Sequence, residues 1–151
     1  MLVRGRVITP VAFVVAALTT PVVAEPRSVA VRAGWAYGLG LEVEYRPNHW
    51  GIGASGGYVP SYGPGGYLGV QWGQRSLGSS GFVAEAGLFR GVHNPLRVAD
   101  TGIGLYAMGG YTLVWGRMSA RGVAGGGLPL GDNDHPISIE FIAKLTVGFL
   151  F

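Results

Sequence analysis

Apolar and polar side chains alternate along this chain, most regularly near its C-terminus. From Ile137 to Phe151 every second residue is apolar, and Glu140 and Lys144 lie at positions between them. Successive side chains of a β-strand point to opposite faces, so a period of two indicates a strand whose faces meet different surroundings. We therefore predict a strand over residues 137–151 with one apolar face.

The same alternation, interrupted by Gly, Pro, Asn and Asp, predicts seven earlier strands. They cover residues 29–37, 39–46, 50–58, 66–74, 82–89, 102–108 and 111–119. The last two come from dividing a stretch that is too long for one strand at Gly109-Gly110, where a tight turn is expected. Six strands with an irregular excursion is the alternative. We expect short turns at residues 46–49, 75–80 and 109–110, and longer connections at 59–65, 93–101 and 123–136.

Eight short alternating strands predict an all-β fold, a closed antiparallel up-and-down transmembrane β-barrel. In such a barrel lipid-facing and lumen-facing residues alternate, and a lysine at the bilayer midplane costs about 2–4 kcal/mol. A shift of one residue in the last strand would turn Glu140 and Lys144 toward lipid. The apolar face is therefore expected to meet lipid and the polar face to line the lumen.

Charged side chains of both signs fall on the face expected to line the lumen. They are Arg32, Glu42, Glu44, Arg46, Glu85, Glu140 and Lys144. Opposite charges can satisfy one another inside a narrow barrel, and an eight-stranded interior is just wide enough for side chains to fill. An ion-paired filling of the lumen is the structural interpretation, and a thin polar pore or gate is the functional alternative.

Aromatic residues gather near the expected strand ends, where a membrane barrel carries one aromatic girdle at each interface. The girdle residues are Trp35, Tyr37 and Tyr58 toward the outer rim, and Tyr45, Trp50, Trp72 and Tyr111 toward the periplasmic rim.

Composition narrows the classes of protein further. The chain has 28 glycines, no cysteine and only 13% charged residues. Glycine costs a helix interior roughly 1 kcal/mol relative to alanine, so a helical bundle is excluded. Without cysteine there is no disulfide, no thiolate metal site and no acylated anchor.

The N-terminus is typical of a cleaved secretory signal. Arg4 and Arg6 precede an apolar stretch, and a small-residue site ends at Ala24. We predict a signal peptide over residues 1–24 and one barrel domain over residues 25–151. The mature chain then has nine basic against eight acidic residues and no basic cluster, so no nucleic-acid partner is expected.

The C-terminal strand resembles the closing signature of outer-membrane β-barrel proteins. The residues that carry it are Leu145, Val147, Phe149 and the terminal Phe151. With the signal peptide and the mature length, the chain resembles the small eight-stranded barrels typified by the OmpA transmembrane domain and OmpX. The resemblance implies recognition by the barrel assembly machinery and a place in the bacterial outer membrane, among its lipid and lipopolysaccharide. A monomer is favoured.

Three motifs could carry chemistry, and each has a simpler interpretation. The glycines of residues 51–56 match a dinucleotide fingerprint, but no helix is expected to follow them. His135, Ser138 and Glu140 offer a base, a nucleophile and a carboxylate, although Ser138 and Glu140 share the lumen face and His135 lies in a connection. Residues 132–135 carry oxygen ligands without the spacing of a calcium loop. We expect no catalytic residue, no metal and no cofactor.

The function expected from these patterns is a structural or surface-interaction role in the outer membrane. A narrow channel for small or hydrophobic solutes is the first alternative. A lipid A-modifying enzyme and a soluble secreted β-sandwich are the others.

Overall fold

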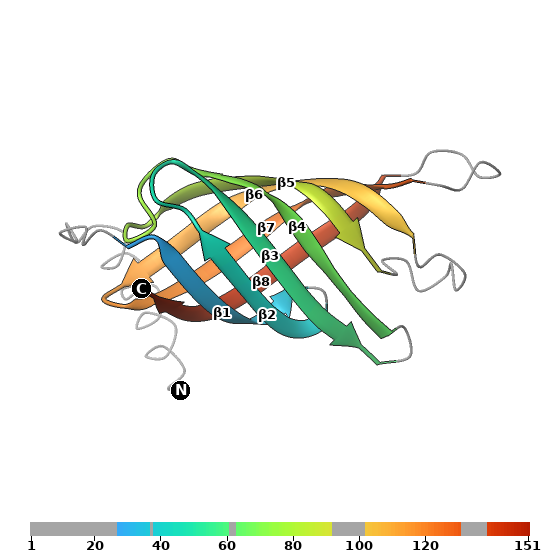
Figure 1. Ribbon diagram of the computed structural model, residues 1–151, viewed down its shortest axis with the longest axis horizontal. Coiled ribbons are helices and arrows are strands. Elements are labelled where there is room, and N and C mark those ends of the chain that lie inside the picture. The colour runs from blue at the N-terminus through green and yellow to red at the C-terminus, as the bar shows by residue number, and fades with distance from the viewer. Residues whose placement is uncertain (1–26, 37, 61–62, 92–101, 131–138) are drawn as a thin grey trace, which may run out of the picture.

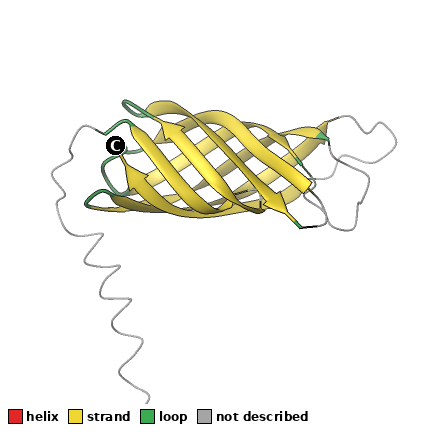
Figure 2. Cartoon of the chain, turned by 60° about the horizontal axis from the view of Figure 1, so that its bottom comes forward, coloured by secondary structure: helices red, strands yellow, loops and turns green. Residues whose placement is uncertain are grey.

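The computed structural model describes residues 27–36, 38–60, 63–91, 102–130 and 139–151, and their fold is all-β (Figures 1 and 2). Eight antiparallel strands form a closed barrel in which each strand pairs with the next along the chain. The strands are β1 (Val29–Ala36), β2 (Gly38–Tyr45), β3 (Trp50–Val59), β4 (Gly63–Gly73), β5 (Gly81–Arg90), β6 (Ile103–Trp115), β7 (Met118–Leu130) and β8 (Glu140–Leu150).

Pairing of the last strand with the first closes the sheet. The register runs from Ala30 opposite Leu150 to Trp35 opposite Leu145. Beyond it, the backbone N–H of Val29 donates to the carbonyl of Phe151 at 3.1 Å, and Phe151 donates back at 2.8 Å. Closure satisfies the strand edges that an open sheet would leave unpaired. The predicted closed eight-stranded up-and-down barrel is confirmed.

The two ends of the barrel differ, and Figure 1 shows them at opposite sides of the view. We call the end that carries Phe151 and the connections at residues 46–49, 74–80 and 116–117 the turn end. The opposite end, where β3 meets β4, β5 ends and β8 begins, we call the loop end. Turns were expected at residues 46–49 and 75–80 and are found there. Residues 61–62, 92–101 and 131–138, within or overlapping the predicted longer connections, lie outside the described residues, as does the predicted signal peptide.

The division of the chain between residues 102 and 121 was predicted wrongly. β6 continues through Gly109 and Gly110, and the turn instead lies at Gly116 and Arg117, with a φ of 62° at Gly116. The end of β6 and the start of β7 therefore take the place of the strand predicted at residues 111–119, and β7 occupies residues 123–130 of the connection predicted at 123–136.

Close packing of two strands explains why Gly110 is a glycine. A Cβ added at Gly110 would collide with the carbonyl oxygen of Gly122 and lie 2.7 Å from the Cα of Val123, both on β7. The residue permits a close backbone approach between neighbouring strands rather than a turn. Glycine pairs in a strand and in a hairpin look alike in a sequence. In this protein the pairing of β6 with β7 shows that Gly109 and Gly110 lie within a strand.

The barrel wall separates large apolar side chains on the outside from polar ones inside. Leu39, Ile139 and Phe141 on the outer face are 74–79% exposed, whereas Arg32, Glu42 and Arg121 on the inner face are 1% exposed. Within the described ranges, no helix has the length and apolar character needed to cross a membrane.

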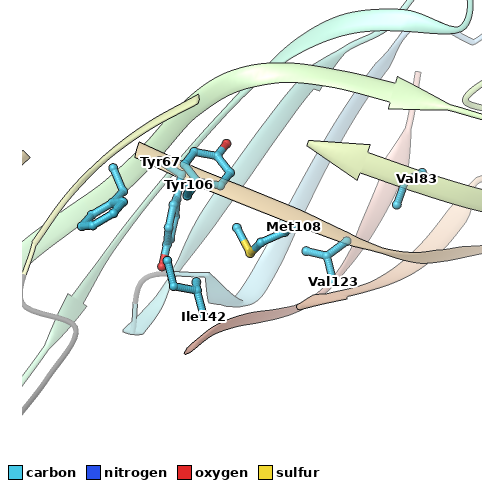
Figure 3. Close-up of a cluster of buried hydrophobic side chains, with 7 residues drawn as sticks. Tyr67, Val83, Tyr106, Met108, Val123 and Ile142 are labelled. Atoms are coloured by element: carbon cyan, nitrogen blue, oxygen red, sulfur yellow. The ribbon is translucent and has the colours of Figure 1, made fainter. Parts of the chain in front are cut away.

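Two apolar clusters share the interior with its polar residues. Toward the loop end lie Tyr67, Phe89, Tyr106 and Ile142, with the rings of Tyr67 and Tyr106 edge to face at 5.1 Å (Figure 3). At the turn end the other cluster consists of Ala30, Leu77, Val114 and Leu150. Leu77 belongs to the β4–β5 connection and is fully buried, so this connection folds over the mouth of the barrel.

Gly110→Ala is expected to destabilise the barrel by about 1–3 kcal/mol, the usual effect of overpacking. The matched control is Gly109→Ala, because a Cβ there meets only the Val83 carbonyl oxygen, at 3.8 Å. Urea unfolding of both purified variants in the same detergent measures the difference. Equal stabilities would contradict the close approach of β6 and β7.

Candidate functional site: a buried ion-pair cluster in the lumen

Polar side chains from six of the strands meet in the middle of the lumen. We call them the lumen cluster. Its members are Arg32 on β1, Glu42 and Glu44 on β2, Arg46 just after β2, Gln71 on β4, Glu85 on β5, Arg121 on β7 and Lys144 on β8. All are buried, the most exposed at only 4%.

Strand alternation and register bring these residues together. Arg32 and Glu42 lie directly opposite one another on β1 and β2, and Gln71 lies opposite Glu85 on β4 and β5. Directly opposed side chains on one face of an antiparallel pair are close enough to interact. Local pairing thus creates two halves of the cluster, which long side chains then join across the lumen.

Arg32 forms the first half of the cluster. Its Nη1 lies 2.9 Å from Oε1 of Glu42 and 2.7 Å from Oε2 of Glu44. Its Nε donates to the Ser119 hydroxyl on β7 at 3.0 Å. One guanidinium therefore links β1 both to its neighbour β2 and to β7, which is not its neighbour.

Arg121 crosses the lumen and joins the two halves. Its Nη1 donates to Oε2 of Glu44 and to Oε1 of Gln71, each at 3.1 Å, and its Nη2 donates to Oε2 of Glu85 at 2.7 Å. These acceptors lie on β2, β4 and β5, none of which pairs with β7. The guanidinium group suits this role because its donors point in several fixed directions.

Lys144 and Arg46 complete the contacts. Nζ of Lys144 lies 3.2 Å from Oε2 of Glu42, contacts Oε1 of Glu85 and sits 5.3 Å from the centre of the Tyr67 ring. Arg46 pairs with Glu44 through Nε at 2.8 Å and donates from Nη1 to the carbonyl of Arg75 at 2.9 Å. The latter bond connects the cluster to the β4–β5 connection that covers the turn end.

The charges of the cluster nearly balance, with four cations against three carboxylates. Each carboxylate contacts at least two cations: Glu42 meets Arg32 and Lys144, for example. A buried ion pair adds little net stability compared with apolar packing, but removing one partner leaves an uncompensated charge and costs about 3–5 kcal/mol. The cluster therefore favours one arrangement of the strands and strongly disfavours others.

Side chains fill the lumen at the level of the cluster. Arg121 reaches from β7 to the opposite wall and is 1% exposed, and the apolar cluster around Leu77 lies between this layer and the turn end. What this arrangement can do chemically is hold the wall together from inside. It does not present an accessible nucleophile or base.

Sequence reasoning found most of this cluster. The structure brings Arg32, Glu42, Glu44, Arg46, Glu85 and Lys144 together, whereas Glu140 lies half-buried at the loop end of β8. Arg121 and Gln71 were not included. Arg121 was missed because the strand predicted at residues 111–119 ended before it. The available signal was the spacing of Ser119, Arg121 and Val123, which places all three on one face of a strand.

The predicted girdle residues lie mostly on the outer face. Trp35 and Tyr58 are exposed at the loop end, and Tyr45, Trp50 and Trp72 are exposed at the turn end. Tyr111 is half-buried, with its ring edge to face with Phe82 at 5.1 Å. Tyr37 lies outside the described residues. The four residues of the C-terminal signature, Leu145, Val147, Phe149 and Phe151, are all exposed on the outer face.

The motifs considered for chemistry are placed only in part. Residues 51–56 lie inside β3, where no helix follows them. His135, Ser138 and residues 132–134 lie outside the described ranges. His49 is exposed, and its Nδ1 is 2.8 Å from the carbonyl oxygen of Gly73. In the described part of the chain no three His, Cys, Asp or Glu residues are grouped to hold a metal ion.

Arg121→Met is expected to destabilise the barrel by about 3–5 kcal/mol, because Glu44 and Glu85 each lose a buried counter-charge. Arg117→Met, in the exposed turn before β7, is the matched control and should change stability by less than about 0.5 kcal/mol. Urea unfolding in detergent measures both. A variant at Arg121 as stable as the control would show that the cluster does not hold the fold.

Comparison of the chain with protein-family models, with curated proteins and with solved structures finds no match.

Proposed function

We propose that this protein is an integral β-barrel of the bacterial outer membrane, with a structural or surface-interaction role and without catalysis. The observation that carries the proposal is the distribution of side chains across the wall. Every strand exposes large apolar residues on the outside, and paired charges lie buried on the inside. A water-soluble monomer rarely combines buried charges with large exposed apolar patches.

The outer apolar surface supports residence in lipid. Leu41, Ile52, Leu68, Phe82 and Leu105, on five different strands, are each about half exposed or more. Soluble monomers rarely expose continuous apolar patches of such extent. In a membrane the same surface contacts the acyl chains of lipids. A closed sheet also pairs its backbone groups internally, as the hydrocarbon requires.

The two ends of the barrel support an orientation. Outer-membrane barrels have short periplasmic turns and longer connections on the outside. We assign the turn end to the periplasm, because it carries Phe151 and the two-residue turn at Gly116 and Arg117. The signal peptide and the C-terminal signature predicted from the sequence agree with export and with recognition by the barrel assembly machinery. Outer-membrane lipid and lipopolysaccharide are the proposed surroundings.

The lumen cluster favours this role over a narrow channel. A narrow channel needs a continuous path, and Arg121 with its partners occupies the lumen at mid-height. We therefore propose a filled barrel whose exposed surfaces carry its function.

In a Gram-negative host, the full-length protein is expected in the outer-membrane fraction, with a faster-migrating form on gels when the sample is not boiled. Val70→Lys, in the middle of the outer face of β4, should then lower the free energy of unfolding from lipid vesicles by about 2–4 kcal/mol.

The matched control is Gln74→Lys, because Gln74 is exposed just beyond the end of β4. A lysine near the interface costs only about 0–1 kcal/mol. Recovery of the protein in the soluble periplasmic fraction, together with a neutral Val70→Lys, would refute the proposed location.

In planar bilayers the purified barrel is expected to show no steady ionic conductance, because the lumen cluster and the Leu77 cluster fill the interior. An open porin reconstituted in the same way serves as the control. Regular single-channel steps from the wild-type protein would overturn the filled barrel and favour the narrow channel.

A further inference from the structure

A cavity of about 660 Å³ opens at the loop end of the barrel, beside β4 and β5. Its volume falls within the range of small-molecule sites, about 300–1,000 Å³. The residues that line it are Ser55, residues 64–68, residues 88–91 and Ile103. It shares no residue with the lumen cluster, which it adjoins at Tyr67, whose ring centre lies 5.3 Å from Nζ of Lys144.

The cavity reaches both faces of the barrel wall. Tyr67 and Phe89 line it from inside and are 5% and 3% exposed, whereas Leu68, Leu88 and Ile103 belong to the outer apolar surface. A pocket confined to the lumen would be lined by inward-facing residues alone. This cavity therefore continues from the interior to the outer face at the edge of the wall.

The pairing of β4 explains why the wall is open at this place. Residues Gly63, Pro64 and Gly65 pair with β3, but the register between β4 and β5 begins only at Gly66, opposite Arg90. This segment consists of two glycines and a proline and therefore contributes no long side chain of its own on the β5 side. Among the described residues, the pairing of β4 with β5 therefore stops short of the loop-end tip of β4.

Two polar residues line the cavity and can orient a bound ligand. Ser55 lines the cavity, and its hydroxyl is buried and finds no hydrogen-bond partner within the described part of the chain. Leaving such a group unpaired costs about 1–3 kcal/mol, which a bound ligand can recover. Arg90 ends β5, is exposed and lines the same cavity, and its guanidinium is suited to a carboxylate or phosphate.

We propose that this cavity binds one acyl chain of an anionic amphiphile taken from the surrounding membrane. The chain lies against Tyr67 and Phe89, and the acidic head group at its end accepts a hydrogen bond from Ser55 and pairs with Arg90. The lateral route of entry rests on the proposed membrane location. The continuous surface of Leu68, Leu88 and Ile103 favours lipid over a water-soluble ligand, because it connects the cavity to the outer apolar face.

Photo-crosslinking tests the site on the full-length protein purified in detergent. The probe is a long-chain fatty acid with a photoreactive diazirine in its chain, and its methyl ester is the uncharged control. Mass spectrometry of the digested protein is expected to find saturable labelling at the inward residues Tyr67 and Phe89. Labelling confined to outer-face residues such as Phe141 on β8, without saturation, would overturn the proposal.

Two pairs of variants test the polar contacts. Ser55→Val should lower the labelling affinity about fivefold, the effect of one hydrogen bond, whereas Thr112→Val removes another buried hydroxyl and should leave it unchanged. Arg90→Gln should lower the labelling affinity of the fatty acid but not that of its methyl ester, and Arg117→Gln should change neither affinity. Unchanged affinities in both Ser55→Val and Arg90→Gln would refute the site.

Barrel formation in each variant is checked by its heat-dependent gel mobility. Arg90 is exposed, so Arg90→Gln keeps the test decisive if Ser55→Val does not fold. The result is separable from the proposed function: inward labelling of a protein found in the soluble fraction would support the cavity and refute the membrane location. A membrane-resident barrel without inward labelling would refute the cavity alone.

Discussion

The hydrogen bonds between β1 and β8 are the interaction on which the rest of this structure depends. They turn a sheet with two open edges into a cylinder of eight strands, and the strand number sets an interior that side chains can just fill. Once the cylinder is closed, every inward residue must share that limited space with residues from the opposite wall. In this chain the lumen cluster and the two apolar clusters fill that space.

Glycine supplies the room that the long inward side chains require. A Cβ at Gly73 would collide with the guanidinium of Arg46, and one at Gly53 would collide with the amide of Gln71. Small and large residues therefore complement one another across neighbouring strands, as in any tightly packed interior. The abundance of glycine, which in the sequence indicated only that the chain is not helical, is in part the counterpart of its buried charges.

Alternation predicted the fold and most of the lumen cluster because both depend on a local property, the face to which each side chain points. The boundary between β6 and β7 depends instead on how two strands pack, and Gly109-Gly110 resembles a turn until the close approach of Gly122 is known. Arg121 was lost through the same error. The cavity was not predicted at all, since it arises where the pairing of β4 with β5 stops at Gly66, and a register is not visible in a periodic pattern.

The contacts of Arg121 have a consequence for how the barrel forms. Its partners Glu44, Gln71 and Glu85 lie on strands that pair with one another or with other neighbours, and none of these strands is adjacent to β7. In a sheet that is still open, these groups are far apart and stay hydrated. Their contacts with Arg121 form only when the cylinder closes, so partly assembled sheets have the local pairs, such as Arg32 with Glu42, but gain nothing from Arg121. The contacts of Arg121 thereby make assembly cooperative, because they form at the step in which β1 pairs with β8.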